Sequence, residues 1–119
     1  FFQTGAGRLM QLTSNRTPSA GTNGYTFIPG GFLLQWGQLA ASKLDTSYTF
    51  LLFATNNTNF ANNCFAVFTQ PYSASPPPSS NEQATVVVRK STVSKTGFQW
   101  AYKTNSGQYN GFFWAAIGN

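Results

Sequence analysis

The sequence predicts an all-β fold, an antiparallel β-sandwich, and three observations carry this prediction. Short runs rich in Phe, Tyr, Val and Leu alternate with turn signals containing Gly, Asn and Pro at regular spacing. No window places apolar residues at i, i+3, i+4 and i+7, as an amphipathic helix would. Hydrophobic residues make up 41% of the 119 residues, so the chain can bury the core of one domain without disulfide bonds.

The N-terminal segment differs in composition from the rest of the chain. Residues 1–24 are rich in Gly, Ser, Thr and Asn and poor in bulky side chains, which is typical of an extended connector, with one short strand around residues 9–12. Residues 25–119 are therefore expected to form the sandwich. Because the chain starts without Met and shows no signal-peptide pattern, we expect it to be a fragment or a processed product.

The first two predicted strands form a hairpin. Residues 25–28 alternate toward the turn signal Pro29-Gly30-Gly31, and residues 32–39 follow as the second strand. A period of two divides the second strand into two faces. One face carries Phe32, Leu34 and Trp36, and the other carries Leu33, Gln35 and Gly37.

The middle of the chain predicts two strands and two loops. Residues 47–55 are dense in Phe and Leu, and residues 64–69 alternate again, so both segments are predicted strands. Asn and Thr dominate residues 56–63, which indicates a loop. Residues 70–81 contain three consecutive prolines, which cannot continue a hydrogen-bonded ladder, and are predicted to form a surface loop.

The last third of the chain predicts three further strands. Residues 83–90 include three consecutive valines and predict a strand that continues extended to residue 95. Gly97 permits a turn or a bulge before the aromatic alternation of residues 98–102. Ser-Gly and Asn-Gly signals mark residues 105–111 as a hairpin-like loop that leads into the final strand, residues 112–118.

The supply of proton-transferring side chains is very small. The chain has no His and two carboxylates, Asp45 and Glu82, which lie in different predicted loops. A glycosidase site with two neighbouring carboxylates is therefore not expected, and a Ser-His-Asp or Cys-His arrangement is excluded because it needs a histidine. With no imidazole and one thiol, Cys64, a metal site is not expected, and the thiol is interpreted as a small buried hydrophobe. We predict no catalytic residue, no cofactor and no metal.

The charged residues are few and mostly basic. Only 8% of the chain is charged, the net charge is +5, and the cations are scattered apart from Arg89-Lys90, which is interpreted as a solvated strand end. This distribution favours attraction to anionic surfaces without forming a nucleic-acid groove. No run of 18 apolar residues exists, so the chain is not expected to be embedded in a membrane.

The aromatic residues exceed what one small sandwich readily buries. The chain contains 20 of them, counting 12 Phe, 5 Tyr and 3 Trp. A symmetric interface between subunits is a natural place for the surplus. Trp36, Trp100 and Trp114 all lie within predicted strands and are expected in the core or in such an interface.

Two motifs resemble the opening and closing signatures of a C-terminal domain found on bacteriophage tail-fibre proteins. The first is FIPGGFLLQWG at residues 27–37, similar to an LPGGLIIQWG-like start, and the second is FWAAIGN at residues 113–119, similar to a WIAIG-like end. Between them lie the aromatic run Phe50–Phe53, the segment Asn62-Asn63-Cys64 and the step Thr96-Gly97-Phe98, which match the family in order. The resemblance covers residues 25–119, and it departs from the family pattern at Phe32 and Phe113.

The resemblance implies a β-sandwich at the distal tip of a homotrimeric fibre on a virion, with residues 1–24 joining it to the shaft. It implies that the domain binds a bacterial surface receptor, either a glycan such as lipopolysaccharide sugar or an outer-membrane protein, during host adsorption. The composition agrees with a glycan-binding surface, because sugar rings stack on aromatic side chains and their hydroxyls pair with Asn, Gln and backbone groups.

Two alternatives to a non-enzymatic receptor-binding tip stay open. A polysaccharide depolymerase fragment is one, because lyases can work with Tyr and Lys in place of His. A structural cap that closes the trimer and binds no ligand is the other. In that role the aromatic residues 112–119 would pack near the threefold axis.

Six residues are candidates for ligand binding. Tyr109 is the favoured stacking platform, and Lys103 and Asn105 flank the same loop, where they could pair with phosphate or hydroxyl groups. Tyr72 lies in a Pro- and Ser-rich loop and is a further candidate. Asn57 and Asn59 either bind sugar or serve as turn residues, and turn chemistry is favoured because Asn tolerates left-handed backbone conformations.

Overall fold

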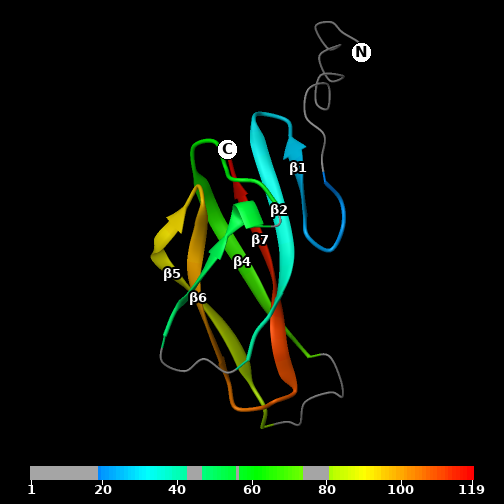
Figure 1. The fold of residues 1–119 in the computed structure, drawn as a ribbon, viewed down its shortest axis with the longest axis vertical. Helices are drawn as coiled ribbons and strands as arrows, with labels where there is room; N and C mark the ends of the chain where they lie inside the picture. Colours follow the sequence, from blue (N-terminus) through cyan, green and yellow to red (C-terminus); the bar gives the residue numbers. More distant parts are fainter. Residues whose placement is uncertain (1–18, 43–46, 56, 74–80) are drawn as a thin grey trace, which may run out of the picture.

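The computed structural model describes residues 19–42, 47–55, 57–73 and 81–119, and the predicted strand around residues 9–12 lies outside them. Within this part of the chain, seven strands form two antiparallel sheets that pack as a β-sandwich (Figure 1), so the predicted fold class is confirmed. The elements are β1 (Gly24–Ile28), β2 (Phe32–Ala40), β3 (Thr49–Leu52), a 3-10 helix (Phe53–Thr55), β4 (Cys64–Ser73), β5 (Ala84–Ser94), β6 (Gly97–Thr104) and β7 (Tyr109–Gly118).

The larger sheet has four strands in the order β1-β2-β7-β4. The hairpin between β1 and β2 turns at Gly30 and Gly31, whose φ angles of 98° and 87° lie in the left-handed region that favours glycine. The last strand, β7, lies between β2 and β4 and pairs with both over most of its length (Figure 1). The C-terminal segment is therefore the centre of the larger sheet.

The smaller sheet has three strands in the order β3-β6-β5. The β5–β6 hairpin supplies most of it, and β3 adds four residues along the other edge of β6. The ladder between β5 and β6 is interrupted after Arg89, and the Thr92 hydroxyl fills the gap. It accepts a hydrogen bond from Gln99 N at 2.8 Å and donates one to Arg89 O at 2.7 Å.

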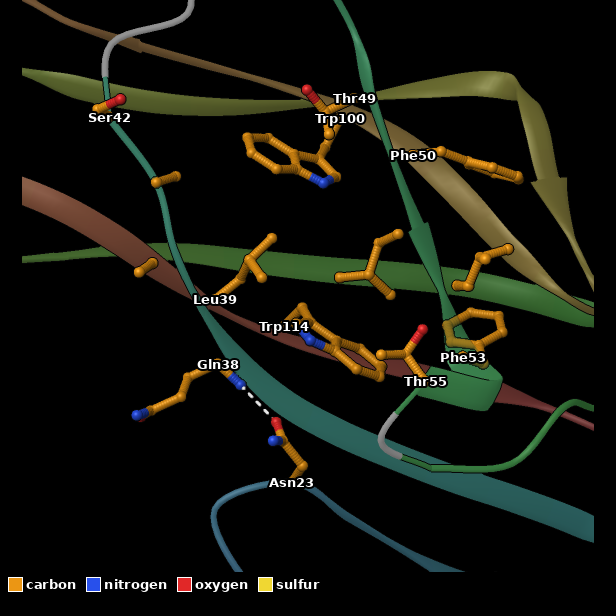
Figure 2. A pocket seen from close by; sticks show the side chains of 14 residues that line it. Asn23, Gln38, Leu39, Ser42, Thr49, Phe50, Phe53, Thr55, Trp100 and Trp114 are labelled. Atoms are coloured by element: carbon orange, nitrogen blue, oxygen red, sulfur yellow. Dashed lines mark hydrogen bonds between the residues drawn. The ribbon is translucent and has the colours of Figure 1, made fainter.

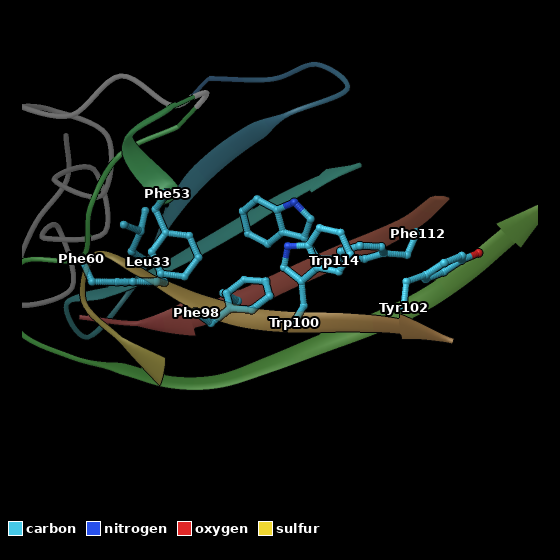
Figure 3. Packing of buried hydrophobic residues seen from close by; sticks show 9 residues of the cluster. Leu33, Phe53, Phe60, Phe98, Trp100, Tyr102, Phe112 and Trp114 are labelled. Carbon is cyan, nitrogen blue, oxygen red and sulfur yellow. The ribbon is translucent and has the colours of Figure 1, made fainter. Parts of the chain in front are cut away.

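Aromatic side chains from both sheets form the core (Figure 3). Most of their rings pack edge to face or tilted, as in the pair Phe53–Phe60 with centroids 5.1 Å apart and the pair Trp100–Phe112 at 5.0 Å, and Tyr102 stacks on Phe112. The Tyr102 hydroxyl is buried and donates to Gly111 O at 2.9 Å, which satisfies its polar end. The buried cluster consists of Leu33, Phe53, Phe60, Phe98, Trp100, Tyr102, Phe112, Trp114 and Ala116.

The strand β2 points its more polar side toward this core. Gln35 is fully buried there and accepts a hydrogen bond from Thr58 N at 3.4 Å, and Gly37 lies on the same side, where the Trp114 indole would collide with any added Cβ atom. Phe32, by contrast, is exposed on the opposite side. The predicted division of β2 into two faces agrees with this burial pattern.

Three predicted boundaries were wrong. The predicted strand 47–55 ends at Leu52, and its last three residues form the 3-10 helix that brings Phe53 into the core. The strand β4 continues through Pro71 to Ser73, where a loop was predicted, because an edge strand tolerates a residue without an N–H group. The predicted loop 105–111 is shorter, since β7 already begins at Tyr109.

Candidate functional site

The outer side of the four-stranded sheet is mostly apolar and carries no charged side chain, although Gln38 and Gln70 are exposed on either side of Phe113. The strands β1, β2, β4 and β7 contain no Asp, Glu, Lys or Arg. Residues that alternate with the core positions point away from it, and four of them are exposed phenylalanines, with Phe68 at 63% and Phe113 at 49%. We call this surface the uncharged face and define it by Phe32, Leu34, Trp36, Phe65, Phe68, Tyr72, Phe113 and Ile117.

Ring contacts give the uncharged face a defined shape. Tyr72 packs on Phe113 with centroids 4.9 Å apart, and its hydroxyl donates to Leu39 O at 3.5 Å, on the far side of β7. The phenol crosses β7 at Gly111, where an added Cβ atom would overlap it. A bulge after Cys64 directs Phe65 outward, where its ring lies 6.3 Å from that of Phe32.

The outer side of the three-stranded sheet combines aromatic and cationic side chains. Register places Phe50 opposite Gln99, Arg89 opposite Gln99, and Lys103 opposite Thr85, all on the side away from the core. Tyr48 and Phe50 are exposed by 42% and 48%. We call this surface the cationic face and define it by Tyr48, Phe50, Leu52, Val87, Arg89, Gln99, Ala101 and Lys103.

Arg89 is the most strongly positioned cation of the cationic face. Its Nη1 donates to Gln99 Oε1 at 3.2 Å, and its guanidinium carbon lies 5.6 Å from the centroid of the Tyr48 ring. The other cations in the part of the chain that the structure describes are Lys90, Lys95 and Lys103, and all of them belong to β5, β6 or the turn between these strands. Charge is therefore segregated between the two sheets.

An uncharged cleft of about 460 Å³ separates the sheets where β2 runs past β3 (Figure 2). Trp100 and Trp114 project into it from opposite sheets, with Leu39, Leu51 and Thr49 around them. The Trp100 indole nitrogen has no hydrogen-bond partner among the described residues, but it also has almost no accessible surface. Polar side chains also line the cleft, namely those of Asn23, Gln38, Ser42, Thr49 and Thr55, and Asn23 Oδ1 accepts a hydrogen bond from Gln38 N at 3.1 Å.

Three of the predicted site residues lie where β6 turns into β7. Tyr109 is half-buried and packs against the core as the first residue of β7, and Lys103 is exposed on β6. The Asn105 side chain accepts from Gln83 N at 2.8 Å and donates to Asn81 O at 2.9 Å. This amide therefore ties the turn to the segment that precedes β5.

The other three predicted residues lie elsewhere. Tyr72 belongs to β4 and the uncharged face, not to a loop. Asn57 donates to Trp36 O at 3.0 Å, so it anchors its loop to β2, and exposed Asn59 lies with Asn119 in a shallow depression. Since Tyr109 and Asn119 are ten residues apart along β7, these two groups lie roughly 30 Å apart at opposite ends of the sandwich. The six residues do not form one site.

The titratable groups indicate no reactive centre among the described residues. Burial raises the pKa of the Cys64 thiol to about 11, so the thiolate is scarce at neutral pH. The thiol itself donates to Ala66 O, with Sγ 3.7 Å from the oxygen. No group of three or more His, Cys, Asp and Glu that could hold a metal ion occurs in the described part of the chain. Nor does any described helix have the length and hydropathy needed to cross a membrane.

Sequence reasoning missed the cationic face. Arg89 looked like a solvated strand end, and Tyr48 and Phe50 looked like members of one more apolar strand. The available signal was the alternation of Phe50 and Leu52 with Leu51, which puts two large apolar side chains on a side away from the core. The pairing of β3 with β6 brings these residues beside Gln99 and Arg89, and that pairing is not visible in the sequence.

Comparison with known proteins identifies the family of this chain. Residues 26–119 match the family model described as "Putative tail fiber protein gp53-like, C-terminal". No curated protein matches the sequence.

The fold is also similar to solved pyocin tail fibres. It matches an N-truncated R2-type pyocin tail fibre with a TM-score of 0.65 and 21% identity, covering 87% of this chain and 37% of that one. It matches an N-truncated R1-type pyocin tail fibre with a TM-score of 0.63 and 24% identity, covering 87% and 84%. It also matches a C-terminal part of a P. aeruginosa R2 pyocin fibre with a TM-score of 0.64 and 20% identity, covering 87% of this chain and 25% of that one. The chain thus spans about a third of the first of these fibres.

Proposed function

The chain belongs to the gp53-like C-terminal family of tail fibre proteins, and we propose that it is the receptor-binding tip of a tail fibre and acts in host adsorption without enzymatic activity. It works as a homotrimer at the distal end of a fibre on a phage or pyocin particle. The segment that precedes β1 connects it to the fibre shaft. Its receptor is a bacterial surface glycan such as lipopolysaccharide.

The observation that carries this proposal is the uncharged face. A sheet surface that lacks charged side chains and exposes four phenylalanines resembles the core of a subunit interface more than a surface in permanent contact with water. Three copies can bury this face against one another around a threefold axis. Burying a charged side chain without a partner is costly, and association through the uncharged face avoids this cost because the face has no charged side chain.

This arrangement leaves the cationic face on the outside of the fibre tip. Bacterial envelope glycans commonly carry phosphate and carboxylate groups, and a positive surface accelerates their encounter with the protein. Three copies on one rigid axis, repeated over several fibres, bind with an avidity far above the affinity of one site. Adhesion therefore follows from assembly and charge without any chemical step.

Two measurements test the proposal. Light scattering of the purified chain should give the mass of a trimer, and the fluorescently labelled protein should bind some strains in a panel of bacteria and not others. A monomer that binds no strain would contradict the proposal. A trimer that binds no strain would favour the structural cap instead.

The depolymerase alternative has its own readout. The protein is incubated with surface polysaccharide purified from a strain that it binds, and the mixture is assayed for new reducing or unsaturated ends. We expect none, because the composition offers neither a histidine nor a carboxylate pair for acid-base catalysis. Sustained release of such ends would identify a depolymerase.

A further inference from the structure

We propose that the cationic face is the docking surface for an acidic saccharide, a sugar chain that carries phosphate or carboxylate groups. This inference rests on the proposed function, since it names the surface and the chemical class of the receptor. Four observations support it: a pre-positioned arginine, exposed aromatic rings beside it, a second cation at a defined spacing, and the absence of carboxylate side chains among the residues of this face that the structure describes.

The guanidinium of Arg89 is held in place before any ligand arrives. Gln99 Oε1 accepts from Nη1 at 3.2 Å, and the Tyr48 ring lies 5.6 Å away. The backbone beneath this pair is fixed as well, because the Thr92 hydroxyl bridges Gln99 N and Arg89 O. A guanidinium has five N–H donors, so most of them stay available to the oxygens of an anion. A side chain that is already ordered loses little entropy on binding.

Aromatic rings lie beside the arginine. Tyr48 and Phe50 are exposed by 42% and 48%, and Phe50 is opposite Gln99 in the β3–β6 ladder. Exposed rings of this kind stack on the apolar C–H side of a sugar ring. A free phosphate ion would use only the arginine, whereas a sugar that carries an anionic group uses the arginine and the rings together.

A second cation lies further along the same face. Arg89 is opposite Gln99 on β6, and Lys103 is four residues beyond Gln99, which corresponds to about 13 Å along the strand. Val87 and Ala101 lie between them and form an apolar floor. Two cations at the ends of an apolar strip suit an extended chain with repeated anionic groups better than a single small anion.

The sign of the charge selects the ligand class. Among the described residues, no Asp or Glu contributes to the cationic face, and their one carboxylate side chain, that of Glu82, precedes β5. An acidic saccharide therefore meets attraction over the whole face. Two cations are too few to follow the phosphates of a nucleic acid, which is bound through many such contacts.

The test compares Arg89→Gln with Lys95→Gln in the assembled protein. Each variant removes one positive charge, but Lys95 lies in the β5–β6 turn, outside the cationic face. Immobilised dextran phosphate, polygalacturonic acid and unmodified dextran serve as probes. We expect wild type to bind at least one of the two anionic polymers, with negligible binding to dextran. We expect Arg89→Gln to weaken this binding at least tenfold and Lys95→Gln less than twofold.

A third variant, Phe50→Ser, removes an aromatic ring without changing the charge, and we expect it to weaken binding about threefold or more. Circular dichroism verifies that every variant is folded. Equal losses of binding in Arg89→Gln and Lys95→Gln would mean that the polymers respond to the net charge alone, and this would overturn the proposal. Binding to unmodified dextran as strong as binding to the anionic polymers would also overturn it.

Cell binding separates this inference from the proposed function. If the protein binds bacteria but neither anionic polymer, and protease treatment of the cells abolishes binding, the receptor is a protein and the acidic-saccharide inference is wrong while the adhesion function stands. If anionic polymers are bound through Arg89 but the protein is a monomer that binds no strain, the proposed function is wrong and the assignment of the face stands.

Discussion

The two outer faces of this sandwich are built from the same kinds of strand but differ in what they leave exposed. The uncharged face exposes phenylalanines from three adjacent strands and has no charged side chain, whereas the cationic face exposes fewer aromatic residues and places Arg89 and Lys103 among them. Exposed aromatic residues alone therefore do not identify a ligand site. The presence or absence of charge beside them separates a surface suited to self-association from one suited to an anionic partner.

The largest expected effect separates the core from the uncharged face. Phe112 and Phe113 are neighbours on β7, with exposed fractions of 0% and 49%. Phe112→Ala leaves a cavity between the sheets and should lower the free energy of unfolding by about 3–5 kcal/mol. Phe113→Ala should weaken assembly and leave the protomer folded. Chemical denaturation and light scattering measure the two effects. Equal loss of folding stability in both variants would contradict the assignment of Phe113 to an interface.

A charge placed on the uncharged face should disrupt assembly. Phe68→Lys puts an unpaired ammonium group into the proposed interface, at a cost of roughly 3 kcal/mol in each subunit. We expect light scattering to shift from trimer to monomer. Val87→Lys, which adds the same charge to the cationic face, should leave the mass unchanged. If Val87→Lys alone dissociates the protein, the two faces have been assigned the wrong way round.

A smaller effect is expected from the bridge that fixes the cationic face. Thr92→Val keeps the shape of the side chain but removes both hydrogen bonds of its hydroxyl, so the free energy of unfolding should fall by about 1–2 kcal/mol. Binding to dextran phosphate should weaken as well, because Arg89 and Gln99 are less well fixed. Thr85→Val, an exposed change on the same strand, is the control for stability and should have no effect in thermal denaturation.

The smallest effect concerns the thiol of Cys64, the first residue of β4. The pKa of Cys64 is raised from 9.0 to about 11 in the folded protein, so folding favours the neutral thiol. Its contribution to stability is complete below pH 9 and is lost as the pH rises through 11. Wild type should therefore lose more stability than Cys64→Ser between pH 8.5 and 11 in thermal melts. Parallel curves for the two proteins would show that the thiol is not buried as described.

The fold was largely predictable from the sequence because alternation and turn signals are local. The β1–β2 hairpin with Gly30 and Gly31, and the two faces of β2, follow from the order of residues alone. The side of β2 that faces the core does not. Hydrophobicity favours Phe32, Leu34 and Trp36, yet Gln35 and Gly37 point inward. Both sides of β2 carry apolar residues, because one side packs on the core and the other belongs to the uncharged face. The composition of the strand therefore does not indicate which side points to the core.

The candidate surfaces were less predictable, because they depend on which strands pair. Arg89, Gln99 and Tyr48 are far apart in the chain and meet only through the β3-β6-β5 order. Tyr72 looked like a loop residue because Pro71 precedes it, but Pro71 is accommodated in the edge strand β4. Asn105 looked like a sugar ligand, and the structure shows its amide bonded to the backbone of Asn81 and Gln83.

The separation of charge between the sheets has a consequence for where such a fibre could work. At physiological ionic strength, dissolved ions largely screen the attraction between exposed charges that lie more than about 8 Å apart, but they hardly weaken apolar contact. A particle moving from fresh water to brine would keep its tip intact while its hold on an anionic envelope loosened. The absence of Lys, Arg, Asp and Glu from four strands would thus make assembly indifferent to salinity and leave attachment responsive to it.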